Sequence, residues 1–283
     1  MTPPITFTFD LEDHRPHPRA PLRYPTITRE VLSFLEDRQV KGTFFVVGEL
    51  VEAQPGLIRE IAECGHEIGL HGWRHVPLTT LTPSSFKEDT TRGKRLLEDV
   101  AGRQVRGFRA PTFSLVAENA DWVTSVLSEL GFEYSSSVLP ARNPLFGYPD
   151  APDQPFRWPG GLIELPAPLT GVGPARVPYL GGVYLRVLPW SVISWTVRRS
   201  RAGKLPFIYC HPYDFDTAEE FWVVPGTGRF GSRLLWLNRK AMYERVERLL
   251  DRGVGAPLGE RLADLPGSDL VFGSRPAPEG PRP

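Results

Sequence analysis

The chain of 283 residues can form one barrel-sized domain or two smaller ones. Its 41% hydrophobic and 23% charged residues are typical of a globular protein and exclude a disordered or fibrous one. The 33 basic and 33 acidic residues cancel, so no charge excess points to nucleic acid or to an anionic membrane. A neutral partner, or a small local charge, is expected instead.

The N-terminal sequence MTPPITFTFD lacks the basic region and apolar stretch of a signal peptide. No apolar run reaches the roughly 18 residues that a membrane-spanning helix needs. We therefore expect a cytoplasmic protein without an integral membrane segment. The two cysteines, Cys64 and Cys210, follow no metal or disulfide spacing and are expected to be buried thiols. The sequence does not predict the oligomeric state.

Predicted strands and helices alternate along most of the chain. Alternating or β-branched and aromatic residues predict strands at 5–9, 42–47, 67–71, 105–111, 132–137 and 205–212. Apolar residues at helical spacing predict helices at 27–39, 57–65, 84–100, 118–131 and 238–250. This alternation indicates βαβ units and a parallel sheet, which we expect to be rolled into a barrel.

Two segments depart from the alternation. Between about residues 140 and 195 the sequence is rich in Pro and Gly turns, as in a binding loop or a lid. The sequence after Leu265 is also rich in Pro and Gly, and we expect it to be mobile. The prediction is one α/β barrel domain over residues 1–265 with a long irregular insertion, followed by a tail at 266–283.

Polar residues follow most of the predicted strands. The carboxyl ends of parallel barrel strands meet at one face, so these side chains are expected to lie together. They are Asp10, Glu12, Asp13, His71, His75, Arg109, Ser135 to Ser137 and His211. Any one of them alone is more often structural, and His66, which precedes its strand, is expected to be so. Their coincidence at successive strand ends favours metal-dependent hydrolysis.

The residue types fit that chemistry. His71 and His75 lie four residues apart in LHGWRH, and two imidazoles with one carboxylate leave open metal positions for water and substrate. A divalent ion would lower the pKa of bound water and polarise a carbonyl oxygen. A separate carboxylate could take the proton of that water, Arg109 could orient that carboxylate, and His211 could protonate the departing nitrogen. The sequence therefore predicts cleavage of an amide or ester.

The motifs TFDLED, HGWRH, RAPTF and FIYCHP, in this order over roughly residues 5–215, resemble the polysaccharide deacetylases, the family 4 carbohydrate esterases. The resemblance implies a distorted (β/α)7 barrel, a divalent metal and removal of N-acetyl groups from amino sugars. Zinc is the expected ion, with Co, Ni, Fe and Mn as alternatives. The family roles imply that Asp10 is the general base, Arg109 tethers it and His211 is the general acid. His71 and His75, with an acidic residue just after Asp10, would bind the metal.

One departure from the family pattern concerns the third metal ligand. The family motif has two adjacent aspartates, whereas Leu11 follows Asp10 here, so the ligand must be Asp13 or Glu12. We choose Asp13 because its shorter side chain resembles the usual ligand, and Glu12 remains the alternative. The runs HGWRH, FRAPTFS, YSSSV, GGVYLR and HPYDFD are similar to intracellular deacetylases associated with bacterial exopolysaccharide loci.

The candidate substrate-binding residues are Pro111, Trp158, Tyr184 and Arg186. Trp158 and Tyr184 could stack on sugar rings or could equally pack a loop, and Arg186 could bind a phosphate or an acidic sugar bidentately. The backbone next to Pro111 could donate to an oxyanion. The expected substrate is an N-acetylated sugar or oligosaccharide. Two alternatives remain: a deformylase or amidase of a small amide on the same barrel, and an inactive sugar-binding protein.

Overall fold

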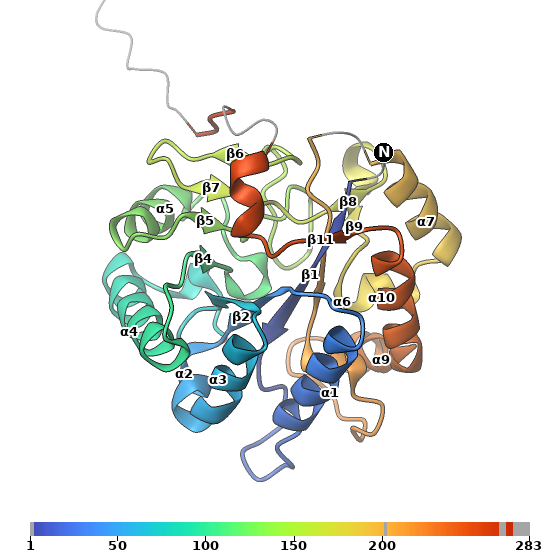
Figure 1. Cartoon of the computed structure of the whole chain (residues 1–283). Coiled ribbons are helices and arrows are strands. Elements are labelled where there is room, and N and C mark those ends of the chain that lie inside the picture. The colour runs from blue at the N-terminus through green and yellow to red at the C-terminus, as the bar shows by residue number, and fades with distance from the viewer. Residues whose placement is uncertain (1–2, 201–202, 266–269, 274–283) are drawn as a thin grey trace, which may run out of the picture.

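The computed structural model describes residues 3–200, 203–265 and 270–273. It confirms the expected α/β class and the distorted barrel: strands lie at the centre and helices surround them (Figure 1). None of the helices in these ranges is long and apolar enough to cross a membrane.

The central sheet is almost entirely parallel. Its strand order is β10-β1-β2-β3-β4-β5-β7-β6, and β11 pairs with the beginning of β1. The strands are β1 (Ile5–Leu11), β2 (Thr43–Val46), β3 (Glu67–Leu70), β4 (Gly107–Phe108), β5 (Tyr134–Ser135), β6 (Phe156–Arg157), β7 (Ile163–Glu164), β10 (Phe207–Cys210) and β11 (Val254–Gly255). Only β6 runs antiparallel to its neighbour within the sheet. The parallel strands therefore present their carboxyl ends at one face.

Each predicted helix has a counterpart in the structure, and several shorter ones were not predicted. The helices are α1 (Tyr24–Glu36), α2 (Gly48–Ala53), α3 (Pro55–Glu63), α4 (Pro83–Ala101), α5 (Ala120–Glu129), α6 (Gly182–Val187), α7 (Trp190–Arg199), α8 (Pro212–Phe215), α9 (Gly228–Trp236) and α10 (Met242–Leu250). The helix expected at 238–250 begins as a short 3₁₀ turn, η4 (Arg239–Ala241), and continues as α10.

The alternation of β1 decides which of its side chains face the barrel interior. Phe7, Phe9 and Leu11 belong to the main hydrophobic core, together with residues of the surrounding helices. Because successive side chains of a strand point to opposite faces, Thr8 and Asp10 face the other way. Thr8 and Asp10 both contact the buried Arg109 there. The sequence pattern of β1 thus places a carboxylate inside the barrel.

The stretch expected to be irregular is more ordered than its sequence indicates. It contributes β7 beside β5, the antiparallel β6, a separate hairpin of β8 (Leu169–Thr170) with β9 (Val177–Pro178), and the helices α6 and α7. The strands are two residues long, too short for a periodic signal.

The expected mobile tail lies largely outside the described residues. Of its residues, 270–273 are described, and Val271 forms a bridge with Arg157 of β6 while Phe272 packs against Trp158. Residues 271 and 272 therefore pack against the domain although they lie beyond the predicted boundary at residue 265. The two cysteines also differ, because Cys210 is buried as expected whereas Cys64 is half-buried.

Candidate active site

Asp10 and Arg109 form a buried ion pair inside the barrel. Nη1 of Arg109, which directly follows β4, lies 2.6 Å from Oδ1 of Asp10 near the end of β1. The guanidinium also donates to Oγ1 of Thr8 at 2.8 Å and to Oγ of Ser136 at 3.0 Å, and it lies over the ring of Phe45. These contacts on several sides hold the guanidinium in place, so it fixes the orientation of the Asp10 carboxylate.

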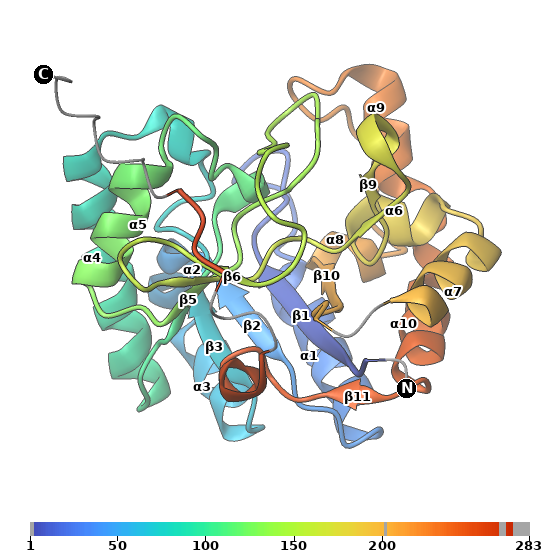
Figure 2. The ribbon, with the colours of Figure 1, turned by 90° about the horizontal axis from the view of Figure 1, so that it is seen from above.

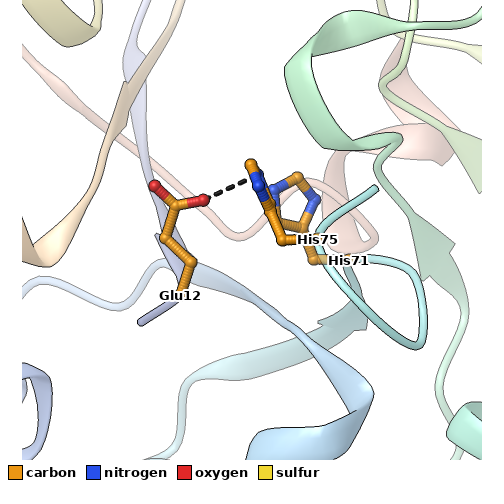
Figure 3. Close-up of side chains that lie close together, drawn as sticks. All are labelled: Glu12, His71 and His75. Atoms are coloured by element: carbon orange, nitrogen blue, oxygen red, sulfur yellow. Dashed lines mark ion pairs between the residues drawn. The ribbon is translucent and has the colours of Figure 1, made fainter. Parts of the chain in front are cut away.

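Glu12, His71 and His75 come together at the carboxyl ends of β1 and β3 (Figure 3). Each offers one ligand atom, and these atoms all lie within 4.8 Å of one another. Nε2 of His75 lies 2.6 Å from Oε2 of Glu12, and the two imidazole rings are 5.2 Å apart. We call these three residues the ligand triad.

His71 and Glu12 have the protonation states that metal binding requires, whereas at His75 burial is outweighed by the Glu12 carboxylate, which raises the pKa, so a metal would have to displace a proton from that ring. Nδ1 of His71 lies 2.8 Å from the carbonyl oxygen of Arg109, so a proton on Nδ1 donates there and Nε2 is left to bind a metal. Burial lowers the pKa of His71 to about 4 and keeps the imidazole neutral. Burial alone would raise the pKa of Glu12, but the neighbouring histidines, His75 first, lower it and keep the carboxylate ionised.

A further observation fits a metal at this position. Oε2 of Glu12 is buried, and its one close polar neighbour among the described residues is Nε2 of His75, at 2.6 Å in an ion pair. A buried carboxylate oxygen beside imidazole nitrogens is the kind of donor set that would hold a divalent ion. Two imidazole nitrogens and one carboxylate oxygen suit zinc or another first-row divalent ion.

The geometry replaces Asp13 with Glu12 as the candidate third ligand. Asp13 is not among the residues whose ligand atoms come together with those of the two histidines, and it forms an ion pair with Arg15 at 2.7 Å. The physical reason is the alternation of the extended chain: Leu11 faces the core, so the side of Asp10 is next reached at residue 12. The prediction of Asp13, which was based on the length of its side chain, did not take this alternation into account.

His211 completes the site from the end of β10. Its Nε2 lies 3.9 Å from Oδ2 of Asp10, and its Nδ1 lies 2.9 Å from Oδ2 of Asp214. Burial disfavours charge on His211, but the hydrogen bond with Asp214 and the carboxylates of Glu12 and Asp10 outweigh it and raise its pKa to about 9. The imidazole is therefore protonated at neutral pH, as a general acid must be.

Arg186 does not have the expected substrate-binding role. Its side chain is fully buried, and its Nε donates to Oδ1 of Asp214 at 2.9 Å. Burial would raise the pKa of Asp214, but His211 and Arg186 lower it and keep the carboxylate charged. Arg186 therefore holds Asp214, the partner of His211, in place. A phosphate cannot reach the buried guanidinium of Arg186.

Trp158 also has a structural role and does not line a binding surface. It is buried against Phe156 and Phe272, and its Nε1 donates to Oε2 of Glu164 at 3.2 Å. Oε1 of Glu164 accepts from the backbone N–H groups of residues 137 and 138, at 2.6 and 2.9 Å. The alternative that this tryptophan packs a loop is the correct one.

The other two substrate-binding candidates lie close to the site. Pro111 is buried against Gly72, the residue after His71. Tyr184 is half-buried on α6, and a Cβ added at Gly182, the first residue of that helix, would lie 3.8 Å from the His211 ring. Both remain candidates for contact with substrate. His66, expected to be structural, is buried, accepts a hydrogen bond from the Gly42 N–H and packs on Phe44.

Sequence reasoning missed Asp214 and Glu164. Asp214 had a usable signal, because it stands three residues after His211 in HPYD, where an acidic side chain can reach back to the first residue of a short helix. Glu164 had no such signal, because it lies in the two-residue strand β7.

Comparisons with known proteins divide the chain into two parts. Residues 2–135 match the sequence model of the polysaccharide deacetylases, and residues 136–254 match that of a domain of unknown function, DUF3473. Residues 2–135 are therefore similar to the polysaccharide deacetylases. This region holds Asp10, Arg109 and the ligand triad, and the region that matches DUF3473 holds His211.

Curated relatives match parts of the chain. The peptidoglycan-N-acetylmuramic acid deacetylase PdaA of Bacillus subtilis is 31% identical over 106 residues, which are 38% of this chain and 39% of PdaA. Chitin deacetylase 1 of Cryptococcus neoformans is 29% identical over 119 residues, which are 42% of this chain and 23% of that protein. The chain thus spans less than two fifths of the length of either relative.

Solved structures agree on the fold. A protein of Mycobacterium smegmatis assigned as a polysaccharide deacetylase superposes over 98% of this chain and 95% of its own, with a TM-score of 0.64 and 24% identity. BA3943 of Bacillus anthracis, a pseudoenzyme of carbohydrate esterase family 4, superposes over 96% of this chain and 71% of its own, with a TM-score of 0.52 and 13% identity. The polysaccharide deacetylase fold therefore occurs with and without activity, and the site residues must carry the functional argument.

Proposed function

We propose that the protein is a metal-dependent N-deacetylase that hydrolyses the N-acetyl amide of an amino sugar. The observation that carries the proposal is the convergence of a tethered carboxylate, Asp10, and a charged histidine, His211, beside the ligand triad. Sugar binding alone does not require a buried carboxylate and a protonated histidine next to each other at a metal site.

The roles of the residues follow from their positions. A divalent ion on the ligand triad, with zinc as our proposal, would polarise the amide carbonyl and lower the pKa of the attacking water. Asp10, held by Arg109, takes a proton from that water as it attacks the carbonyl carbon. His211 gives its proton to the amide nitrogen as the carbon–nitrogen bond breaks. The products are acetate and a free amine.

The substrate class rests on similarity and on the neighbourhood of the site. The curated relatives are named as deacetylases of peptidoglycan and chitin, which are N-acetylated glycans. The resemblance to deacetylases of exopolysaccharide loci leads us to propose a glycan or glycan precursor of that kind. Tyr184, on the helix that begins beside His211, is the proposed sugar contact.

The test combines metal content with acetate release from a short N-acetylglucosamine oligomer. We expect one equivalent of divalent metal, acetate release that stops with a chelator and returns with added metal, and loss of both metal and activity in His71→Ala. A metal-loaded protein that releases formate from a formamido sugar but no acetate would move the function to the alternative amidase. Metal-loaded protein without turnover on either amide would place it with the pseudoenzymes.

A further inference from the structure

Helix α9 presents an apolar and basic surface that no described part of the chain covers. Phe230 is 78% exposed, and Leu237, just after the helix, is 45% exposed. Leu237 stands seven positions after Phe230, a spacing that puts both on one face of a helix. Ser232 is the one buried residue of α9, and Leu234, Leu235 and Trp236 are half-buried. Phe230 and Leu237 are therefore the apolar side chains that this segment leaves exposed.

Basic side chains flank the apolar ones. Arg229, Arg233 and Lys240 are exposed and make no ion pair or hydrogen bond within the described residues. In contrast, the acidic residues of the same segment are mostly neutralised, since Asp216 pairs with Arg23 and Glu219 with Arg239. Glu220 is the exposed exception. The surface is locally positive although the whole chain is neutral. We call Arg229, Phe230, Arg233, Leu237 and Lys240 the α9 face.

The α9 face is fixed beside the active site. Trp236 of α9 and Trp222 pack near the ring of His14, at 5.9 and 5.0 Å, two residues after Glu12. Tyr213 packs against His14, with ring centroids 4.5 Å apart, and stacks on His211 at 4.7 Å. Figure 2 shows α9 at the edge of the molecule opposite β11, on the side toward which β1 runs. A surface that binds α9 would therefore lie next to the mouth of the site.

We propose that the α9 face lies in the interface of an anionic lipid bilayer. Phe230 and Leu237 would enter the boundary between headgroups and acyl chains, and the three cations would contact lipid phosphates. Charge complementarity favours this partner, since three exposed cations flank the exposed apolar side chains of Phe230 and Leu237. The inference does not depend on the proposed function, because lipid binding is measured without turnover.

The experiment is sedimentation of the full chain with vesicles. One set contains phosphatidylcholine alone, and the other contains phosphatidylcholine with phosphatidylglycerol. We expect binding to the second set that weakens with salt, and little binding to the first. Arg229→Ala with Arg233→Ala should weaken binding roughly 30-fold, and Phe230→Ser roughly tenfold. Circular dichroism and thermal unfolding establish that the variants fold.

Matched controls lie away from the α9 face. Val254→Ser alters an exposed apolar residue of β11, and Arg95→Ala removes an exposed cation from α4; both should bind as the unaltered chain does. The proposal fails if the chain stays in solution with both vesicle sets, binds both equally, or binds unchanged in the α9 variants. It also fails if an acidic polysaccharide binds the α9 face while anionic vesicles do not.

Discussion

The two matched regions contribute differently to one site. The region 2–135 supplies the ligand triad, the proposed base Asp10 and Arg109, which holds it, from β1 and from the segments after β1, β3 and β4. The region 136–254 supplies His211 from the end of β10, and behind it a buried pair of Asp214 and Arg186. The first region holds the whole ligand triad, whereas the proposed acid comes from the second. Metal binding and proton delivery should therefore be separable by substitution.

The largest expected effect is at the base. Asp10→Asn removes the proton acceptor while preserving the shape of the side chain, so kcat should fall roughly 10³-fold to 10⁴-fold. Metal content should be unchanged, because Asp10 is not in the ligand triad. Acetate release and metal analysis on the same preparation measure both quantities. Full activity in this variant would remove Asp10 from the mechanism.

The two regions also hold buried histidines with opposite pKa shifts. His66 has no carboxylate partner, and burial lowers its pKa to about 4, whereas Asp214 helps raise that of His211 to about 9. The unfolded chain takes up a proton at His66 near pH 6.5 and the folded chain only near 4. The contribution of neutral His66 to the free energy of unfolding is therefore fully present above pH 6.5. It is lost as the pH falls toward 4, which lowers the free energy of unfolding by about 3 kcal/mol.

Urea unfolding at a series of pH values measures this contribution. In His66→Asn, whose side-chain oxygen can still accept from the Gly42 N–H, the loss of stability on acidification should be smaller. His17→Asn is the control, because His17 is exposed, and its profile should follow that of the unaltered chain. Identical profiles for all three proteins would show that His66 is not held neutral by burial.

A smaller effect is expected at Asp214, the hydrogen-bond partner of the proposed acid His211. Asp214→Asn removes the carboxylate that stabilises charge on His211, so the His211 pKa should fall from about 9 and the alkaline limb of the pH profile should move to lower pH. Activity at neutral pH should drop roughly tenfold. Metal content should stay the same.

Asp216→Asn is the matched control for that change. Asp216 lies two residues further on and pairs with Arg23 instead of His211. The alkaline limb of the kcat/KM–pH profile of Asp216→Asn should coincide with that of the unaltered protein. An unmoved limb in Asp214→Asn would mean that the second region does not tune the acid.

The smallest effect concerns the corrected role of Trp158. Trp158→Phe loses the hydrogen bond to Glu164 but keeps most of the packing, so stability should fall by about 1 kcal/mol. KM for the glycan oligomer should not change, because the indole is buried away from substrate. Unfolding and steady-state kinetics measure the two quantities. A KM raised tenfold or more in a stably folded variant would restore the substrate-binding interpretation.

The accuracy of the sequence analysis follows the same division. Polar residues at or directly after the carboxyl end of a predicted strand, such as Asp10 and His71, could be assigned to one face because strand direction alone places them there. Glu12 could have been chosen over Asp13 from the alternation of β1. Arg186 in the six-residue helix α6 and Trp158 after the two-residue strand β6 could not be assigned, because elements this short carry no clear periodicity and the sequence does not show whether a side chain is buried. The cytoplasmic location and the choice of zinc stay predictions.

The most direct test of the site compares Glu12→Gln with Asp13→Asn, two charge removals at neighbouring positions. Metal content and acetate release are measured for each, after thermal unfolding has shown that both variants fold. The structure predicts that Glu12→Gln loses bound metal and activity, whereas Asp13→Asn, which loses only its contact with Arg15, keeps both. Metal lost in Asp13→Asn and kept in Glu12→Gln would contradict the ligand triad and the site built on it.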